Sequence, residues 1–239
     1  MNTHPEAPAA PPLKGRHRRP GKAGSALALV PILVSLLSAG CAEPDRSRNL
    51  ADSRVHGAVL AQQVCANCHG PGGNSVSPNF PALAGQSRAY LATQLRAFRD
   101  KSRHDPQAVA YMFGLARSLT DTQIDELADY YSAQSARPQS AAVSTQSTIA
   151  AGQAIYLRGT GNNAPACVAC HGDRAQGTAA APRLAGQHAA YIERQLRIYQ
   201  TSNDRPDGGV MKLACSGMTA EDMRAVAAFV QSLAAAPPG

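Results

Sequence analysis

The sequence predicts an all-α protein built from two copies of one helical unit, each of about 90 residues. Three observations carry this prediction. Short segments recur at matching places in the two halves of the chain, apolar residues follow helical spacing in both, and no convincing stretch alternates in the manner of a β-strand. The chain is globular, because 44% of its residues are hydrophobic and its Gly and Pro residues follow no period.

The repeat is clearest in residues 81–86 (PALAGQ) and 182–187 (PRLAGQ). Behind each segment, apolar side chains recur at i, i+4 and i+7, as on one face of an amphipathic helix: Leu91, Leu95 and Phe98, then Ile192, Leu196 and Tyr199. Thr120 and Thr219 stand at matching places with Gln or Asp three residues later. This spacing predicts that a capping box opens the last helix of each unit.

The expected organisation has five parts. They are a signal segment (1–40), a linker after a lipidated cysteine (41–54), a first domain (55–135), a second linker (136–147) and a second domain (148–235). The linker 136–147 is polar and has no apolar period. Residues 158–164 (RGTGNNA) are extra in the second copy and predict a surface loop.

The positive charge is concentrated at the start of the chain. The net charge is +7, and residues 1–40 carry five Lys or Arg against one Glu, so 5 − 1 = +4 lies there. No basic stripe interleaved with aromatics follows, which argues against nucleic-acid binding. An uncharged apolar run (25–40) ends in small residues before Cys41, and residues 37–41 (LSAGC) resemble the lipobox of bacterial lipoproteins, although Ser38 departs from it. We expect export to the periplasm and lipidation of Cys41, with ordinary cleavage or an uncleaved anchor as alternatives.

Two Cys-X-X-Cys-His motifs, one in each copy, are typical of covalent attachment of c-type haem. The residues concerned are Cys65, Cys68 and His69, then Cys167, Cys170 and His171. Cysteines three apart on a helix can reach both vinyl groups of one porphyrin, and the adjacent histidine then binds the iron. A zinc ribbon would place its Cys pairs about 15 to 20 residues apart, far closer than here, and a thioredoxin-like pair would follow a strand.

Together these motifs resemble a di-haem class I cytochrome c of the cytochrome c4 family, over residues 55–233. The resemblance implies two tandem cytochrome c domains related by pseudo-twofold symmetry, each holding one haem c. It also implies that the carbonyls of Pro81 and Pro182 accept the ring N–H of the axial histidines. Three features depart from the family pattern: the lipobox-like N-terminal segment, Cys215 and the loop at 158–164.

Each iron needs a second axial ligand, and a neutral, soft methionine thioether suits a high potential. In the first unit Met112 is the only methionine after the haem motif. In the second unit the repeat places Met211 against Met112, whereas Met218 falls against a leucine and Met223 lies inside the last helix. We therefore expect Met112 and Met211 to bind iron. The other histidines, which have no repeat counterpart, are expected at the surface: His56, His104 and His188.

Some further side chains have two interpretations. Four arginines could offset haem propionates or lie on solvated helix faces, and the second is favoured: Arg96, Arg99, Arg194 and Arg197. Cys215 corresponds to Ala116 in the first unit, so we expect a small buried thiol rather than an intermolecular disulfide.

The resemblance implies an electron carrier of bacterial respiration rather than an enzyme. Its redox partners would be a quinol-oxidising complex or dehydrogenase as donor and a terminal oxidase as acceptor. The alternative is a dedicated di-haem subunit of a periplasmic dehydrogenase. A di-haem peroxidase is disfavoured, because it needs an iron with an open position, whereas both units offer a methionine.

Overall fold

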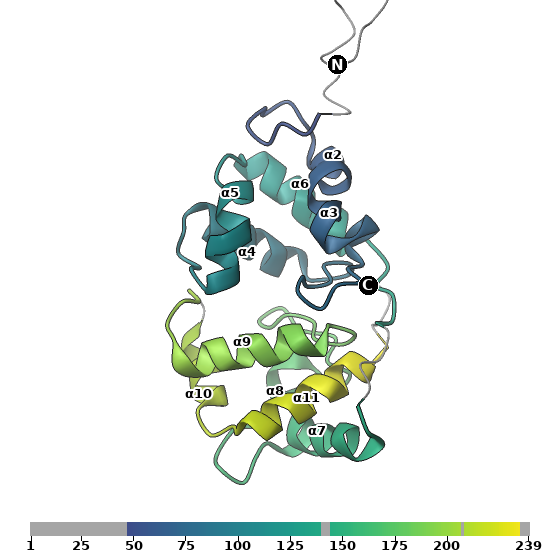
Figure 1. Ribbon diagram of the computed structural model, residues 1–239, viewed down its shortest axis with the longest axis vertical. Coiled ribbons are helices and arrows are strands. Elements are labelled where there is room, and N and C mark those ends of the chain that lie inside the picture. The colour runs from purple at the N-terminus through teal and green to yellow at the C-terminus, as the bar shows by residue number, and fades with distance from the viewer. Residues whose placement is uncertain (1–46, 140–143, 207, 235–239) are drawn as a thin grey trace, which may run out of the picture. The chain divides into compact units, whose positions relative to one another are not determined.

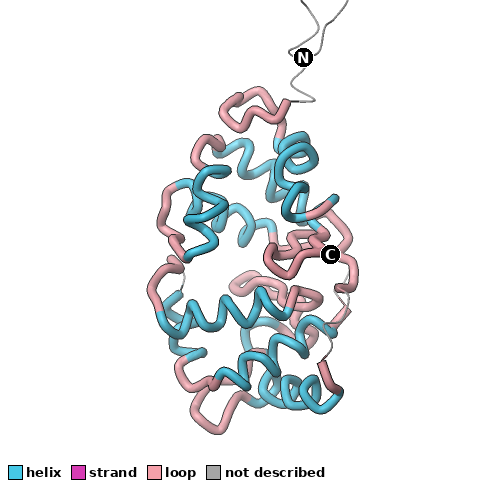
Figure 2. The backbone as a smooth tube through the Cα atoms, in the orientation of Figure 1, coloured by secondary structure: helices cyan, strands magenta, loops and turns pink. Residues whose placement is uncertain are grey.

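The computed structural model describes residues 47–139, 144–206 and 208–234, all within one compact unit of the chain. The expected signal segment and the lipidation site at Cys41 lie outside these residues. The described residues form helices, turns and loops without any strand, as predicted (Figure 2). Within the same residues, no helix is long and apolar enough to cross a membrane.

The first half begins with a helix whose middle is one π-helical turn. Its elements are α2 (Gly57–Leu60), η2 (Ala61–Cys65), α3 (Ala66–His69), η3 (Pro71–Gly73), α4 (Arg88–Arg99), η4 (Ala108–Met112), α5 (Phe113–Ala116) and α6 (Asp121–Ser132). Since α2, η2 and α3 follow one another without a break, the first haem motif lies at the end of a continuous helix (Figure 1).

The second half repeats this order with one interruption. Its elements are α7 (Gln146–Arg158), α8 (Val168–His171), α9 (Ala189–Thr201), α10 (Gly208–Cys215) and α11 (Ala220–Ser232). A loop separates α7 from α8, where the extra residues of the second copy lie. α7 begins at Gln146, so the last two residues of the expected linker are helical, because the Thr145 side chain caps the helix by accepting from the Thr148 N–H at 3.2 Å.

The predicted capping boxes are present in both halves. The Thr120 hydroxyl accepts from the Gln123 N–H at 3.1 Å, and the Gln123 side chain bonds back to the Thr120 N–H at 3.1 Å. Thr219 and Asp222 make the same exchange, at 3.1 and 2.8 Å. Orphan donors at the start of α6 and α11 are thereby satisfied.

Each half has its own apolar core. The first core includes Val55, Leu60, Leu91, Ile124 and Leu127, and the second includes Tyr156, Ile192, Met223, Val226 and Val230. α6 packs against α2 and α4, and α11 packs in the equivalent way against α7 and α9. Met223, which the sequence places inside the last helix, is 1% exposed and belongs to the second core. Two small helical units are thus built from one sequence pattern.

Candidate functional site

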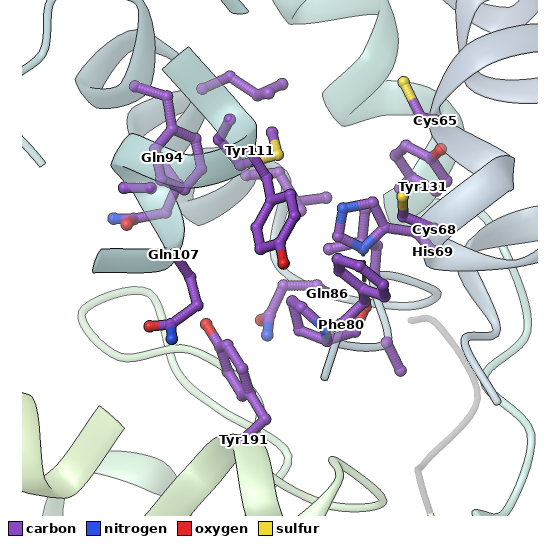
Figure 3. A pocket seen from close by; sticks show the side chains of 18 of the residues that line it. Cys65, Cys68, His69, Phe80, Gln86, Gln94, Gln107, Tyr111, Tyr131 and Tyr191 are labelled. Carbon is purple, nitrogen blue, oxygen red and sulfur yellow. Dashed lines mark hydrogen bonds between the residues drawn. The ribbon is translucent and has the colours of Figure 1, made fainter. Parts of the chain in front are cut away.

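The residues of the first haem motif line an apolar cavity. Cys65 ends η2, while Cys68 and His69 belong to α3, so the two thiols are about one helical turn apart. Figure 3 shows Cys65, Cys68 and His69 on the same side of this cavity. Burial raises the pKa of the Cys65 thiol to about 11, which keeps it neutral in its apolar surroundings.

Both motif histidines are fixed by a proline carbonyl. His69 Nδ1 lies 2.9 Å from the Pro81 oxygen, and His171 Nδ1 lies 2.9 Å from the Pro182 oxygen. Because a carbonyl only accepts, Nδ1 carries the proton and Nε2 is left with a free lone pair. Burial also lowers the pKa of both rings, which favours the neutral form that can bind a metal.

The apolar lining of the cavity beside His69 suits a largely apolar prosthetic group. Met112 lines it together with aliphatic and aromatic side chains of several elements, among them Val64, Leu83, Leu91, Leu95, Phe98 and Leu127. Phe80 packs edge-on to the His69 ring at 6.2 Å between centroids, and Tyr111 packs on Phe80 at 5.5 Å. These rings shield one side of the histidine.

The second motif has the same local arrangement. Cys167 directly precedes α8, which carries Cys170 and His171. Burial raises the pKa of the Cys167 thiol to about 11, as for Cys65. Met211, on α10, packs half-buried against the second core, whereas Met218 is 8% exposed and belongs to that core. The burial of Met218 in this core agrees with the leucine at its counterpart, Leu119, which is buried in the first core.

The two cysteine pairs do not form one metal site. Cys65 packs against the first core and Cys167 against the second. Among the described residues, no three or more His, Cys, Asp or Glu side chains are grouped to hold a metal ion. The zinc alternative requires all four thiols at one point, which this arrangement does not provide.

One expectation about histidines is wrong. His56 and His104 are exposed, as predicted, but His188 is 6% exposed and its Nε2 lies 2.9 Å from the Ser75 carbonyl oxygen in the other half. The ring is buried because it bonds to Ser75 in the opposite half. A pattern within one repeat cannot reveal a partner in the other. It fills a position that Ser87 occupies in the first copy.

Three of the four arginines considered for the propionates pair with acids on helix surfaces. The pairs are Arg96 with Asp125 (2.9 Å), Arg99 with Asp121 (2.9 Å) and Arg197 with Glu193 (2.6 Å). The favoured interpretation holds for these three. Arg194 differs, since it lines the cavity and donates to the Asn79 carbonyl at 3.0 Å.

Two buried arginines were missed by the sequence analysis. Arg103 and Arg205 are each 5% exposed, and each guanidinium covers an aromatic ring, Phe98 at 4.5 Å and Tyr199 at 4.9 Å. Both donate to the Gln195 side chain. The two rings are 101 positions apart, at equivalent places in the repeat, whereas the two arginines are 102 positions apart and do not align with each other. Their shared place near the end of the amphipathic helix was the available signal.

Cys215 is a buried thiol, as expected. It is 1% exposed, and its counterpart Ala116 is 0% exposed. Burial raises the pKa of the Cys215 thiol to about 12. None of the cysteines among the described residues forms a disulfide.

The chain is similar in sequence and in structure to known proteins. The family model described as Cytochrome c matches residues 55–133 and 149–234. Cytochrome c4 of Pseudomonas aeruginosa is 34% identical over 175 residues, 71% of this chain and 84% of that protein. A thiosulfate dehydrogenase electron acceptor of Thiomonas intermedia is 38% identical, over 72% of this chain and 78% of that protein. The solved structure of Acidithiobacillus ferrooxidans cytochrome c4 has a TM-score of 0.66 at 37% identity, covering 71% of this chain and 98% of that one.

Proposed function

The chain belongs to the cytochrome c4 family, and we propose that it relays electrons in bacterial respiration from a quinol-oxidising complex or dehydrogenase to a terminal oxidase. It is a di-haem c-type electron carrier with two cytochrome c domains. Haem c supplies one-electron chemistry through its iron. The protein binds, orients and insulates that group.

Each domain contributes one set of haem-binding residues in this proposal. Cys65, Cys68, Cys167 and Cys170 would hold the two haems through thioethers. His69 with Met112, and His171 with Met211, would bind the two irons. The observation that supports this most directly is the pair of 2.9 Å contacts from His Nδ1 to a proline carbonyl. Such outer partners fix the ring orientation and the tautomer of a ligating histidine.

The same residues tune the reduction potential. A neutral methionine thioether stabilises ferrous relative to ferric iron and so raises the potential above that of a second histidine. The apolar lining of the cavity excludes water and disfavours the extra charge of the ferric state. The chain is therefore suited to accept and release electrons without binding a substrate.

A redox titration with optical spectra, combined with intact mass, tests the proposal. The mature protein should exceed its polypeptide mass by two haem units and titrate as two one-electron centres. Replacing both Cys65 and Cys68 by serine should remove one haem and leave the other. A wild-type mass gain of one haem or none would contradict the proposal.

A second role is favoured by one relative. The 38% identity to a thiosulfate dehydrogenase electron acceptor supports service as the di-haem electron-transfer subunit of a periplasmic dehydrogenase. Purification of the tagged holoprotein from its native cell distinguishes the two roles. A catalytic dehydrogenase subunit recovered in a fixed ratio supports the dedicated subunit, whereas a carrier that purifies alone and reduces an oxidase supports the shuttle.

We further propose that the protein acts in the periplasm, held at the membrane by lipid on Cys41. The apolar run at 25–40, followed by small residues and a cysteine, supports this. The variant Cys41→Ser should move the holoprotein from the membrane fraction to the soluble fraction. Membrane attachment that survives the substitution would indicate an uncleaved helix instead.

The same proposal makes the protein a carrier rather than a peroxidase. With Met112 and Met211 bound, neither iron would offer an open position. Carbon monoxide should leave the spectrum of the reduced native protein unchanged. Binding of one equivalent would instead reveal an accessible iron and favour enzymatic function.

A further inference from the structure

The two halves exchange a reciprocal pair of glutamine contacts. Gln187 of the second half accepts from the Ala82 N–H at 2.9 Å and donates to the Ala82 carbonyl at 2.9 Å. Gln86 of the first half accepts from the Arg183 N–H at 2.9 Å and donates to the Arg183 carbonyl at 3.0 Å. Gln86 and Gln187 end the two copies of the repeated segment, so the contacts are related by the repeat.

These contacts involve the same peptide groups that hold the motif histidines. The peptide joining Pro81 to Ala82 presents its C=O to His69 Nδ1, while its N–H donates to Gln187 Oε1. The peptide joining Pro182 to Arg183 lies in the same way between His171 and Gln86. Because a peptide group is planar and conjugated, a bond at its N–H fixes and polarises its C=O.

The residues that make these contacts are buried. Gln86 and Gln187 are 5% and 3% exposed, and Ala82 and Arg183 are 3% and 4% exposed. In such low-dielectric surroundings hydrogen-bond chains strengthen one another, by about 10–30% per bond. Because the site is buried, water cannot easily replace the hydrogen bonds of a glutamine amide that has been removed.

The second contact is reinforced by a buried cation. The Arg183 guanidinium donates to the Ala84 carbonyl at 2.7 Å and to the Gly85 carbonyl at 3.2 Å, both in the first half. Burial lowers the pKa of this side chain to about 10, so it is still charged at neutral pH. The peptide that faces His171 is thus held firmly against the other half.

We propose that Gln187 and Gln86 are positioning residues that act across the two halves, Gln187 on the haem bound by His69 and Gln86 on the haem bound by His171. Each glutamine polarises the proline carbonyl that accepts the histidine ring proton, so the imidazole is more electron-donating and favours ferric iron. The reduction potential of each haem therefore depends on a side chain of the opposite half. This inference rests on the proposed axial roles of His69 and His171.

The test compares Gln187→Leu with Gln86→Leu in the full-length holoprotein. Leucine keeps most of the side-chain volume but removes both hydrogen bonds to the opposite half, together with the bond that each glutamine accepts from the N–H of the next residue. Redox titration followed by proton NMR resolves the two haems, and the Nδ1–H signals of His69 and His171 in the reduced protein report each hydrogen bond to proline. Gln187→Leu should raise the reduction potential of the His69 haem by about 30 mV, which is a threefold change in the redox equilibrium constant at 59 mV per tenfold. The His69 Nδ1–H signal should also move in the direction of a weaker hydrogen bond. Gln86→Leu should do the same to the His171 haem.

A matched control separates this effect from general loosening of the contact between the halves. His188→Ala removes another bond between them, from His188 Nε2 to the Ser75 carbonyl, without touching either proline peptide. It should leave both potentials unchanged. A shift confined to the haem of the glutamine's own half, equal shifts in both haems, or no shift would overturn the inference.

If a leucine variant does not fold, Gln187→Glu provides the second measurement. A carboxylate accepts more strongly from the Ala82 N–H, so the His69 Nδ1–H signal should move in the direction of a stronger hydrogen bond while the His171 signal stays in place. An unmoved His69 signal would overturn the inference. The intact mass distinguishes failure of this inference from failure of the proposed function. A variant that carries both haems tests the role of the glutamines. A wild-type protein without two haems would contradict the proposed function.

Discussion

Gly152 of α7 lies directly against the backbone of Ala225 in α11. A Cβ at position 152 would meet the Ala225 carbonyl oxygen at 2.0 Å and the Ala225 carbonyl carbon at 2.5 Å. Gly57 in α2 has the equivalent relationship to α6, where a Cβ would meet the Leu127 backbone nitrogen at 2.7 Å. The first and last helices of each half therefore cross at a glycine, and backbone lies on backbone.

Gly152→Ala should destabilise the second half. The added methyl group would force α7 away from α11, which costs about 1–3 kcal/mol as overpacking. Thermal unfolding followed by circular dichroism measures the effect. Gly114→Ala is the control, because a Cβ there meets no atom within 4 Å, and alanine favours a helix. Equal melting temperatures for Gly152→Ala and the parent would contradict the close contact.

Met211→Ala should remove the methionine ligand from the second haem only. The methionine-to-iron charge-transfer band of the ferric protein should then fall to about half its intensity, because one of two such centres is lost. Absorption spectroscopy of the oxidised holoprotein measures this. The potential of that haem should change in the same titration while the other keeps its value.

Met218→Leu is the matched control for that variant. Met218 is buried in the second core, and its first-half counterpart Leu119 is a leucine that is equally buried. The substitution keeps the volume and should leave both haem spectra intact, at a stability cost of less than about 1.5 kcal/mol. Loss of the band in Met218→Leu rather than in Met211→Ala would show that the ligand is Met218.

Cys215 should be inert in the folded protein. Its thiol is buried and has a pKa raised to about 12, so little thiolate exists at neutral pH. Iodoacetamide should label it only after denaturation, as intact mass would show. Cys215→Ala should be tolerated within about 1 kcal/mol, since Ala116 fills the same place in the first half. A dimer on a non-reducing gel that disappears in Cys215→Ala would contradict this placement.

Stability should depend on pH through His188. Burial lowers the pKa of this ring in the folded protein below its value of about 6.5 in an unfolded chain. Above about pH 6.5 both states are neutral there, whereas at lower pH the unfolded chain gains a proton that the folded chain excludes. The free energy of unfolding should therefore fall as the pH drops from about 6.5 towards the folded pKa, by at most about 1.4 kcal/mol per pH unit.

Urea unfolding of the holoprotein at several pH values between 7.5 and 5 measures this slope. His188→Gln carries no titratable group, so its slope should be smaller than that of the parent. His56→Gln is a second control, because the His56 side chain is 70% exposed and its Nδ1 lies 3.2 Å from Glu126 Oε1. A parent and a His188→Gln variant with identical slopes would show that His188 is not excluded from protonation when folded.

The sequence alone determined the fold class, the repeat and the main chemistry. Helical periodicity depends only on which residues recur along the chain, so the stripes in α4 and α9 and the capping boxes at Thr120 and Thr219 could be predicted. The spacing of Cys and His in the two motifs is likewise a local property. The buried thiol at position 215 followed from its alanine counterpart.

Only the tertiary structure decided how the two copies meet. His188 was expected at the surface, but it is buried because its partner, Ser75, lies in the other half. The burial of Arg103 and Arg205 was not predicted, because both donate to Gln195 from positions that do not align in the repeat. The glutamine contacts with Ala82 and Arg183 also join residues about a hundred positions apart, and side-chain pairing at that separation leaves no period in a single sequence. Local spacing thus encodes each unit, whereas the burial of polar groups between units is set by which surfaces come into contact.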